Sequence, residues 1–239
     1  MEYNSQRVPV EQYAPAGLDL MDGPVALVRQ QHTQQTMGDA LLKTKTHYTF
    51  EEYEELVRNA GRGERYEYSN GIIIPLNEYT TLRHNQIIQN AADLLKTYFY
   101  PKGCRVYTEN ARLVVEEGNE YRLPDVVATC SERDLRSEST IHDPVVLVEV
   151  LSPGTAMQDL GPKTDAYRKI VSLQAYLIVN PQAVWVRVCE RNAGGDWLAD
   201  RSYTSRSETF TIANLNLQVS LAELYRFVTI PDPEPERKP

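Results

Sequence analysis

The 239-residue sequence is poor in cysteine and tryptophan, with three and two residues. Cys104, Cys130 and Cys189 lie far apart in the chain. They form neither the CxxC pairs of a structural zinc site nor the even-numbered set of a disulfide framework. We therefore predict three buried thiols in a protein from a reducing compartment.

Long apolar runs and an excess of basic residues are also absent. No stretch reaches the roughly 18 consecutive apolar residues of a membrane span, and the first residues lack a signal-peptide pattern. We expect a soluble, cytoplasmic protein with no membrane partner. The formal net charge of -8 argues against a nucleic-acid binder that works by bulk electrostatics, because phosphates are neutralised by clustered Lys and Arg. The net charge is compatible with a local basic groove.

The signatures of serine and cysteine hydrolases are missing as well. The sequence has no GxSxG elbow, and no cysteine stands in a recognisable nucleophile context. A hydrolase that uses Ser or Cys therefore lacks support.

Composition divides the chain into three parts. Residues 1–43 are polar, Gln-rich and interrupted by Pro and Gly, which predicts a largely flexible extension. Residues 44–230 carry regular apolar patterns, and the 41% hydrophobic content of the chain is sufficient for a core. Residues 231–239 are rich in Pro and charge, which predicts a disordered tail.

Helical and strand patterns alternate within residues 44–230. Thr49 and Glu52 have the spacing of a capping box, and Asn70-Gly71 is a strong two-residue hairpin signal. Apolar spacing predicts a long helix from about 80 to 99, a helix at 159–169 and a short final helix at 221–227. Strands are expected at 104–107, 111–116, 126–130, 145–150, 175–180, 183–190, 196–204 and 208–217. This mixed order predicts one α/β or α+β domain.

Two lone acids on apolar runs are the most informative feature. VVLVEV, at 145–150, is nearly continuous in apolar and β-branched residues, as in strands covered on both faces. Glu149 lies in this run, and Asp125 heads the run PDVVATC. A carboxylate buried on a strand needs a partner, so the pair favours a shared divalent ion such as Mg²⁺. The helix that follows could bring Lys163 over the same site.

An ordered series of motifs carries a family resemblance. The series runs YTFEEYEEL, RYEYSNGIIIPL, His84, RLPDVVATC and PVVLVEVLSPGTAMQDLGPKTDAYRKIVSLQAYLIV. It resembles the Uma-two family of restriction endonucleases within the PD-(D/E)xK nuclease superfamily. The resemblance covers about residues 47–227.

This resemblance implies a restriction-endonuclease-like core, in which helices flank a mixed central β-sheet, and metal-dependent hydrolysis of phosphodiester bonds in DNA. Asp125, Glu149 and the backbone carbonyl of Val150 are the implied ligands of Mg²⁺ or Mn²⁺. The superfamily places a lysine two residues after the second acid, where this chain has Leu151. In the branch resembled, the next helix supplies the lysine, and Lys163 matches it. By analogy with nucleases that pair to cut both strands, a homodimer is expected.

Other residues near this constellation have two interpretations each. Glu67 is either a further ligand, direct or through water, or a strand-surface residue. His84 is either a catalytic or substrate-contacting group or a partly exposed structural histidine. Asp159 either acts directly or caps and orients the helix, and Tyr167 either stacks on bases or belongs to the core. Lys163 itself could form an exposed salt bridge with Asp159.

Two classes of function follow. The first is a metal-dependent endonuclease, in which Lys163, Arg168 and Lys169 form a basic cluster that steers phosphates, unless that cluster is an ordinary solvated helix face. The second is a protein that keeps the nuclease fold as an interaction or nucleic-acid-binding module. The acidic balance and Leu151 favour the second class, whereas Asp125, Glu149 and Lys163 together favour the first.

Overall fold

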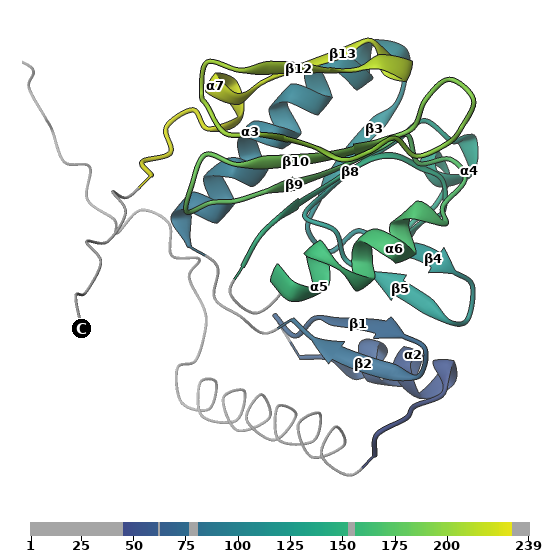
Figure 1. Cartoon of the computed structure of the whole chain (residues 1–239). Helices are drawn as coiled ribbons and strands as arrows, with labels where there is room; N and C mark the ends of the chain where they lie inside the picture. Colours follow the sequence, from purple (N-terminus) through teal and green to yellow (C-terminus); the bar gives the residue numbers. More distant parts are fainter. Residues whose placement is uncertain (1–44, 62, 77–80, 153–155, 231–239) are drawn as a thin grey trace, which may run out of the picture. The chain divides into compact units, whose positions relative to one another are not determined.

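The computed structural model describes residues 45–61, 63–76, 81–152 and 156–230 (Figure 1). The predicted extension at 1–43 and the predicted tail at 231–239 lie outside these residues, so the domain limits stay predictions.

A six-stranded sheet forms the centre of the described fold. Its order is β11-β10-β9-β8-β6-β3, and all neighbours are antiparallel except β8 and β9. Its strands are β3 (Arg105–Thr108), β6 (Val126–Thr129), β8 (Pro144–Val150), β9 (Ala175–Val179), β10 (Val186–Glu190) and β11 (Arg201–Tyr203). The expectation that the VVLVEV run forms a central strand is confirmed, since β8 has two strands on one side and three on the other.

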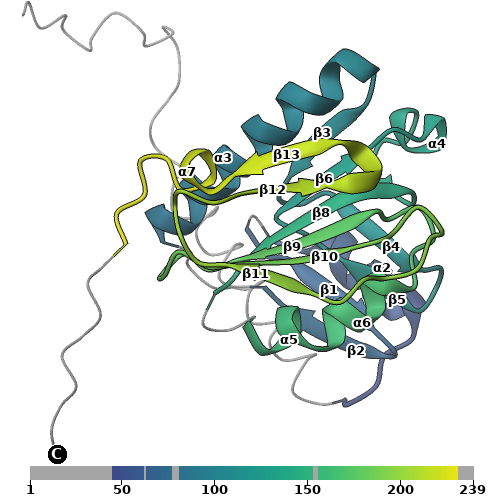
Figure 2. The same ribbon diagram turned by 45° about the horizontal axis from the view of Figure 1, so that its top comes forward.

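Both faces of this sheet are covered, which explains why β8 is apolar along nearly its whole length. Val146, Val148 and Val150 point into the core beneath the long helix α3 (Leu82–Phe99). Leu147 and Glu149 alternate with them and point to the opposite face, where Tyr167 of α6 (Pro162–Arg168) packs. The α3 side is completed by α7 (Leu221–Leu224) and the hairpin of β12 (Thr209–Ile212) and β13 (Leu217–Ser220), as Figure 2 shows.

A second sheet of five strands contributes a polar face to the interior. Its order is β2-β1-β5-β4-β7. Its strands are β1 (Tyr66–Ser69), β2 (Ile72–Pro75), β4 (Arg112–Glu116), β5 (Glu120–Arg122) and β7 (Thr140–Ile141). Tyr68 and Tyr121 stack on α2 (Phe50–Asn59). The alternate residues Glu67 and Arg122 are therefore on the other face, near α5 (Ala156–Leu160) and α6 (Figure 1).

The fold class is confirmed as mixed α+β, with helices flanking mixed sheets, although the strands divide among three sheets. The capping box of Thr49 and Glu52 is present. The predicted hairpin turn is formed by Asn70 and Gly71, which have φ angles of 49° and 82°. The described part of the chain also contains α4 (Glu132–Leu135) and the 3₁₀ helices η2 (Tyr100–Lys102) and η3 (Ala213–Leu215).

Several predicted elements differ from the structure. The strand expected at 208–217 is divided by η3 into the antiparallel strands β12 and β13, and the helix expected at 221–227 ends at Leu224. The helix expected at 159–169 is divided into α5 and α6, because Pro162 lacks an N–H and restricts the backbone of Gly161 before it. The strand expected at 196–204 is limited to Arg201–Tyr203, and Trp197 forms only an isolated bridge with Arg191.

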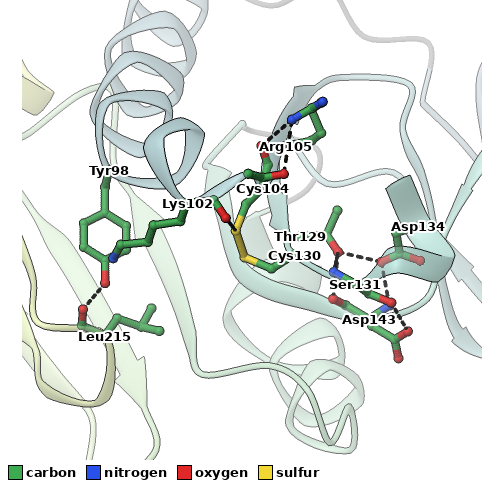
Figure 3. Close-up of a disulfide and its surroundings, with 11 residues drawn as sticks. Tyr98, Lys102, Cys104, Arg105, Thr129, Cys130, Ser131, Asp134, Asp143 and Leu215 are labelled. Atoms are coloured by element: carbon green, nitrogen blue, oxygen red, sulfur yellow. Dashed lines mark hydrogen bonds between the residues drawn. A yellow bond between two sulfur atoms is a disulfide. The ribbon is translucent and has the colours of Figure 1, made fainter. Parts of the chain in front are cut away.

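The prediction of three thiols is wrong. Cys104 and Cys130 form a disulfide, and their Cα atoms lie 4.3 Å apart (Figure 3). They are 26 residues apart in sequence, but Arg105 pairs with Thr129 across the antiparallel strands β3 and β6. Cys104, just before β3, therefore lies opposite Cys130, just after β6. Cys189 is the buried thiol, and burial raises its pKa to about 11. The cysteines therefore no longer support a reducing compartment.

Among the helices of the described residues, none combines the length and apolar character needed to cross a membrane.

Replacing Cys104 and Cys130 together by Ser should lower the free energy of unfolding by about 3 kcal/mol, because the bridge closes a loop of roughly 25 residues. Urea titration of the wild type and the variant without reductant measures this difference. Reductant should shift the wild-type midpoint and leave that of the variant unchanged. Three alkylated thiols in wild type denatured without reductant would contradict the bridge.

Candidate active site

The two acids of the PD and VEV motifs lie side by side. Val126 pairs with Val148 across β6 and β8, which places Asp125 beside Glu149 and Val150. The Val150 N–H donates to Asp125 Oδ2 at 2.7 Å, and the Asp125 N–H donates to Glu149 Oε2 at 3.3 Å. Each carboxylate thus accepts a backbone N–H from the neighbouring segment, and the two acids that the sequence singled out lie next to each other.

Lys163 reaches this pair from α6. Its Nζ lies 3.2 Å from Glu149 Oε1, 3.2 Å from Glu67 Oε1 and 3.1 Å from Asp159 Oδ1. The i, i+4 pair with Asp159 therefore exists, but it is buried, since Lys163 is only 3% exposed. Burial disfavours the charged amine, but the attraction of the three carboxylates outweighs it and raises the pKa of Lys163.

Tyr167 fixes the acid on β8. Its hydroxyl donates to Glu149 Oε1 at 2.8 Å, and its ring makes an edge contact with Tyr176. The Tyr167 side chain is fully buried. It is therefore a core residue that hydrogen-bonds a site carboxylate, and the predicted stacking on bases is excluded in this conformation.

Glu67 is buried and belongs to the same cluster, so the strand-surface interpretation is wrong. Its Oε1 accepts the Leu123 N–H at 3.0 Å in addition to the Lys163 contact, and its Oε2 accepts Arg122 Nη1 at 3.1 Å. Arg122 also donates to Glu120 Oε1 at 2.6 Å.

Arg122 and Glu120 are the site-linked residues that the sequence analysis missed. They alternate with Tyr121 on β5, a polar and aromatic alternation that could have indicated a strand with one polar face turned inward.

His84 is buried beside the acids, which corrects the expectation of a partly exposed histidine. It lies in the first turn of α3, whose N-cap Thr81 accepts its backbone N–H. His84 Nε2 is 2.8 Å from the Val150 carbonyl oxygen and 3.6 Å from Asp125 Oδ2. The carbonyl predicted as a metal ligand is thus within hydrogen-bond distance of this ring.

The predicted basic cluster is not formed. Lys163 is buried, and Arg168 pairs with Asp200 at 2.6 Å while its carbonyl accepts the Trp197 indole N–H. Of the three cations expected to attract phosphates, Lys163 is therefore buried and Arg168 is engaged in a part-buried salt bridge.

The site carries an excess of negative charge. Four carboxylates contact the cations Arg122 and Lys163, and Asp125 lies beside Glu149, so acidic groups exceed these two cations by three (five minus two); the acids are Glu67, Glu120, Asp125, Glu149 and Asp159. Burial raises the pKa of Asp125 to about 6 and that of Glu149 well above its usual value. The nearby carboxylates add to the effect on Glu149.

A hard divalent cation fits this donor set. Asp125, Glu149 and the Val150 carbonyl offer only oxygen atoms, and a cation would offset the uncompensated carboxylate charge. Within the described ranges no group of three or more His, Cys, Asp or Glu side chains is arranged to hold a metal. Two carboxylates suffice for Mg²⁺, which keeps several waters.

Comparison with known proteins identifies the family. Residues 50–222 match the Uma2 family, described as "Putative restriction endonuclease". The chain belongs to the Uma2 family. Membership in this family supports a nuclease-like function.

Two relatives and one solved structure are similar to this chain. The Synechocystis sp. protein slr1290 is 29% identical over 163 residues, which are 68% of this Uma2 chain and 84% of the relative. A second Synechocystis sp. protein, sll1609, is 28% identical over 147 residues, 61% and 82% of the two chains. The crystal structure of "a putative nuclease belonging to DUF820 from Anabaena variabilis ATCC 29413" has a TM-score of 0.61 at 16% identity, covers 76% of this chain and 99% of its own, and shows the shared fold.

The raised pKa of Asp125 predicts how the stability of this Uma2 protein depends on pH without metal. Asp125 ionises near pH 6 when folded and near pH 3.9 when unfolded. The folded state therefore binds the proton more tightly, and the free energy of unfolding should fall by up to about 3 kcal/mol as the pH rises from 4 to above 6. Glu149 acts in the same direction.

Urea titrations in chelator between pH 4 and 8 measure this dependence. Asp125→Asn should make the free energy of unfolding less dependent on pH and should be more stable than wild type at pH 8. Asp93→Asn, at an exposed position, should show neither effect. If the free energy of unfolding depended on pH in the same way in Asp125→Asn and wild type, the raised pKa of Asp125 would be contradicted.

Proposed function

We propose that this Uma2 protein is a metal-dependent endonuclease that hydrolyses phosphodiester bonds in DNA. The observation that carries the proposal is the convergence of the Glu149 carboxylate, the adjacent Asp125 and the Lys163 amine. An acid pair and one lysine are the groups that metal-assisted phosphodiester hydrolysis uses.

Asp125 and Glu149 would hold the ion, with the Val150 carbonyl as a third oxygen if His84 yields it. A bound Mg²⁺ or Mn²⁺ supplies Lewis-acid activation of water and of the scissile phosphate. Asp125 and Glu149 carry raised pKa values without metal, so a cation at this place would keep both carboxylates ionised.

Lys163 takes the role of the lysine that Leu151 does not provide. Because three carboxylates surround its amine, the amine stays protonated and points to the acid pair. Such a charge stabilises the negative charge that develops on the phosphate, or orients the attacking water. Tyr167 donates to Glu149 and holds its carboxylate in the orientation needed for the contact with Lys163 and for the proposed binding of the ion.

Asp125→Asn and Lys163→Ala should each reduce Mg²⁺-dependent nicking or cleavage of DNA by about 10²- to 10³-fold, because the first removes a ligand charge for the ion and the second removes the positive charge at the reacting phosphate. Plasmid and oligonucleotide cleavage with purified proteins measures the loss. Asp93→Asn and Lys96→Ala on α3 are matched controls that should keep wild-type rates. Undiminished activity in folded Asp125→Asn or Lys163→Ala protein would refute the mechanism.

A second candidate is a nuclease-fold protein that serves as an interaction or nucleic-acid-binding module. The burial of Lys163 among three carboxylates and the apolar Leu151 favour it, because the amine is not free to meet a phosphate in this conformation.

Calorimetry with Mn²⁺ separates the two functions. Wild type should show a binding site that Glu149→Ala lacks if the protein is the proposed enzyme. A wild type that binds DNA but neither Mn²⁺ nor Mg²⁺ would favour the module. We also propose DNA as the partner and a homodimer as the active assembly, which light scattering with and without DNA tests.

A further inference from the structure

We infer that Arg122 is a positioning residue of the active site: it holds Glu67, and Glu67 holds the amine of Lys163. This inference rests on the proposed function, because the role of Lys163 belongs to that reaction. It assigns Glu67 to the orientation of the lysine and leaves the metal to Asp125 and Glu149.

The contacts form a buried chain of alternating charge. Glu120 Oε1 accepts Arg122 Nη2 at 2.6 Å and Nε at 3.2 Å, and Arg122 Nη1 donates to Glu67 Oε2 at 3.1 Å. Glu67 Oε1 then lies 3.2 Å from Lys163 Nζ. The chain leads from β5 through β1 to α6, so it ties the polar face of the five-stranded sheet to the acids of the six-stranded sheet.

Both oxygens of Glu67 are already used in this chain. Oε2 faces Arg122, and Oε1 receives the Leu123 N–H and the Lys163 amine. These three donors orient the carboxylate and occupy three of its about four lone-pair sites, which favours a positioning role over direct metal binding. Glu67 therefore acts on the amine, and Arg122 supplies a positive charge that offsets the burial of the Glu67 side chain, which is 1% exposed.

The position of Lys163 on a helix explains why it needs such support. A lysine side chain has a flexible four-carbon stem and binds as a point charge, so the backbone alone does not fix its amine. Contacts from β1, β8 and α5 fix it from three directions. When Glu149 is engaged with a metal ion, Glu67 and Asp159 remain to hold the amine.

Arg122→Met tests the inference, since Met keeps an unbranched side chain and removes the charge. The expected result is a 10- to 100-fold lower kcat for DNA cleavage, with KM for DNA and the Kd for Mn²⁺ each within about threefold of wild type. Arg122→Lys should recover part of kcat, because a lysine keeps the positive charge but its ammonium cannot make all the contacts that the guanidinium makes with Glu67 and Glu120. Arg112→Met is the control. It removes an arginine of β4 on the same sheet, which pairs with Glu54 of α2, and it should leave kcat unchanged.

A double-mutant cycle with Glu67→Gln separates positioning from a general loss of structure. If Arg122 acts through Glu67, the double variant should have the same kcat as Glu67→Gln alone. Multiplicative losses of kcat would overturn the inference. Should Arg122→Met fail to fold, Glu120→Gln/Arg122→Met removes the charges in balance, and Arg122→Lys completes the same cycle.

A crystal structure of the folded Arg122 variant gives a readout that does not depend on activity. Lys163 Nζ should leave Glu67 Oε1, whereas an unchanged separation near 3.2 Å together with wild-type kcat would refute the positioning role. If wild type cleaves no DNA, the proposed function fails, and this structure alone decides whether Arg122 orients the lysine through Glu67.

Discussion

The attraction between one buried ammonium and three buried carboxylates is the interaction on which the site depends. A carboxylate removed from water costs several kcal/mol unless a cation or hydrogen bonds offset that cost. Lys163 provides this compensation to Glu67, Glu149 and Asp159 at once, and these acids come from three different elements. The ammonium therefore holds a strand of each large sheet and the α5 helix together at the same place.

The compensation is incomplete, and this imbalance connects stability with function. Asp125 and Glu149 keep raised pKa values because burial disfavours the ionised carboxylates more than the nearby positive charges favour them. If the site holds a divalent cation as proposed, the charges that destabilise the fold without the ion would also increase the affinity for it. The acid pair is thus poorly suited to a purely structural role.

Local sequence signals predicted the elements that depend on neighbouring residues. The capping box at Thr49, the Asn70-Gly71 turn and the apolar run around Glu149 are each decided within a few positions, and all three are present. The acid pair was predictable for a related reason, because an isolated acid on a buried strand must have a partner. The pairing of distant strands was not predictable in this way. It determines the Cys104 to Cys130 bridge, the burial of Arg122 and the division into separate sheets.

Lys163, the proposed catalytic lysine, lies on the connection between β8 and β9, the two parallel strands, and this location has a consequence for control of the site. The carboxylates of Asp125 and Glu149 are fixed by the hydrogen-bond ladder of the sheet, whereas Lys163 belongs to a short helix outside that ladder. A local opening of the connection would withdraw the ammonium and leave the ion-binding acids in place. Under the proposed mechanism, such an opening would leave the ion bound without the ammonium, and cleavage would depend on the folding of the seven residues of α6.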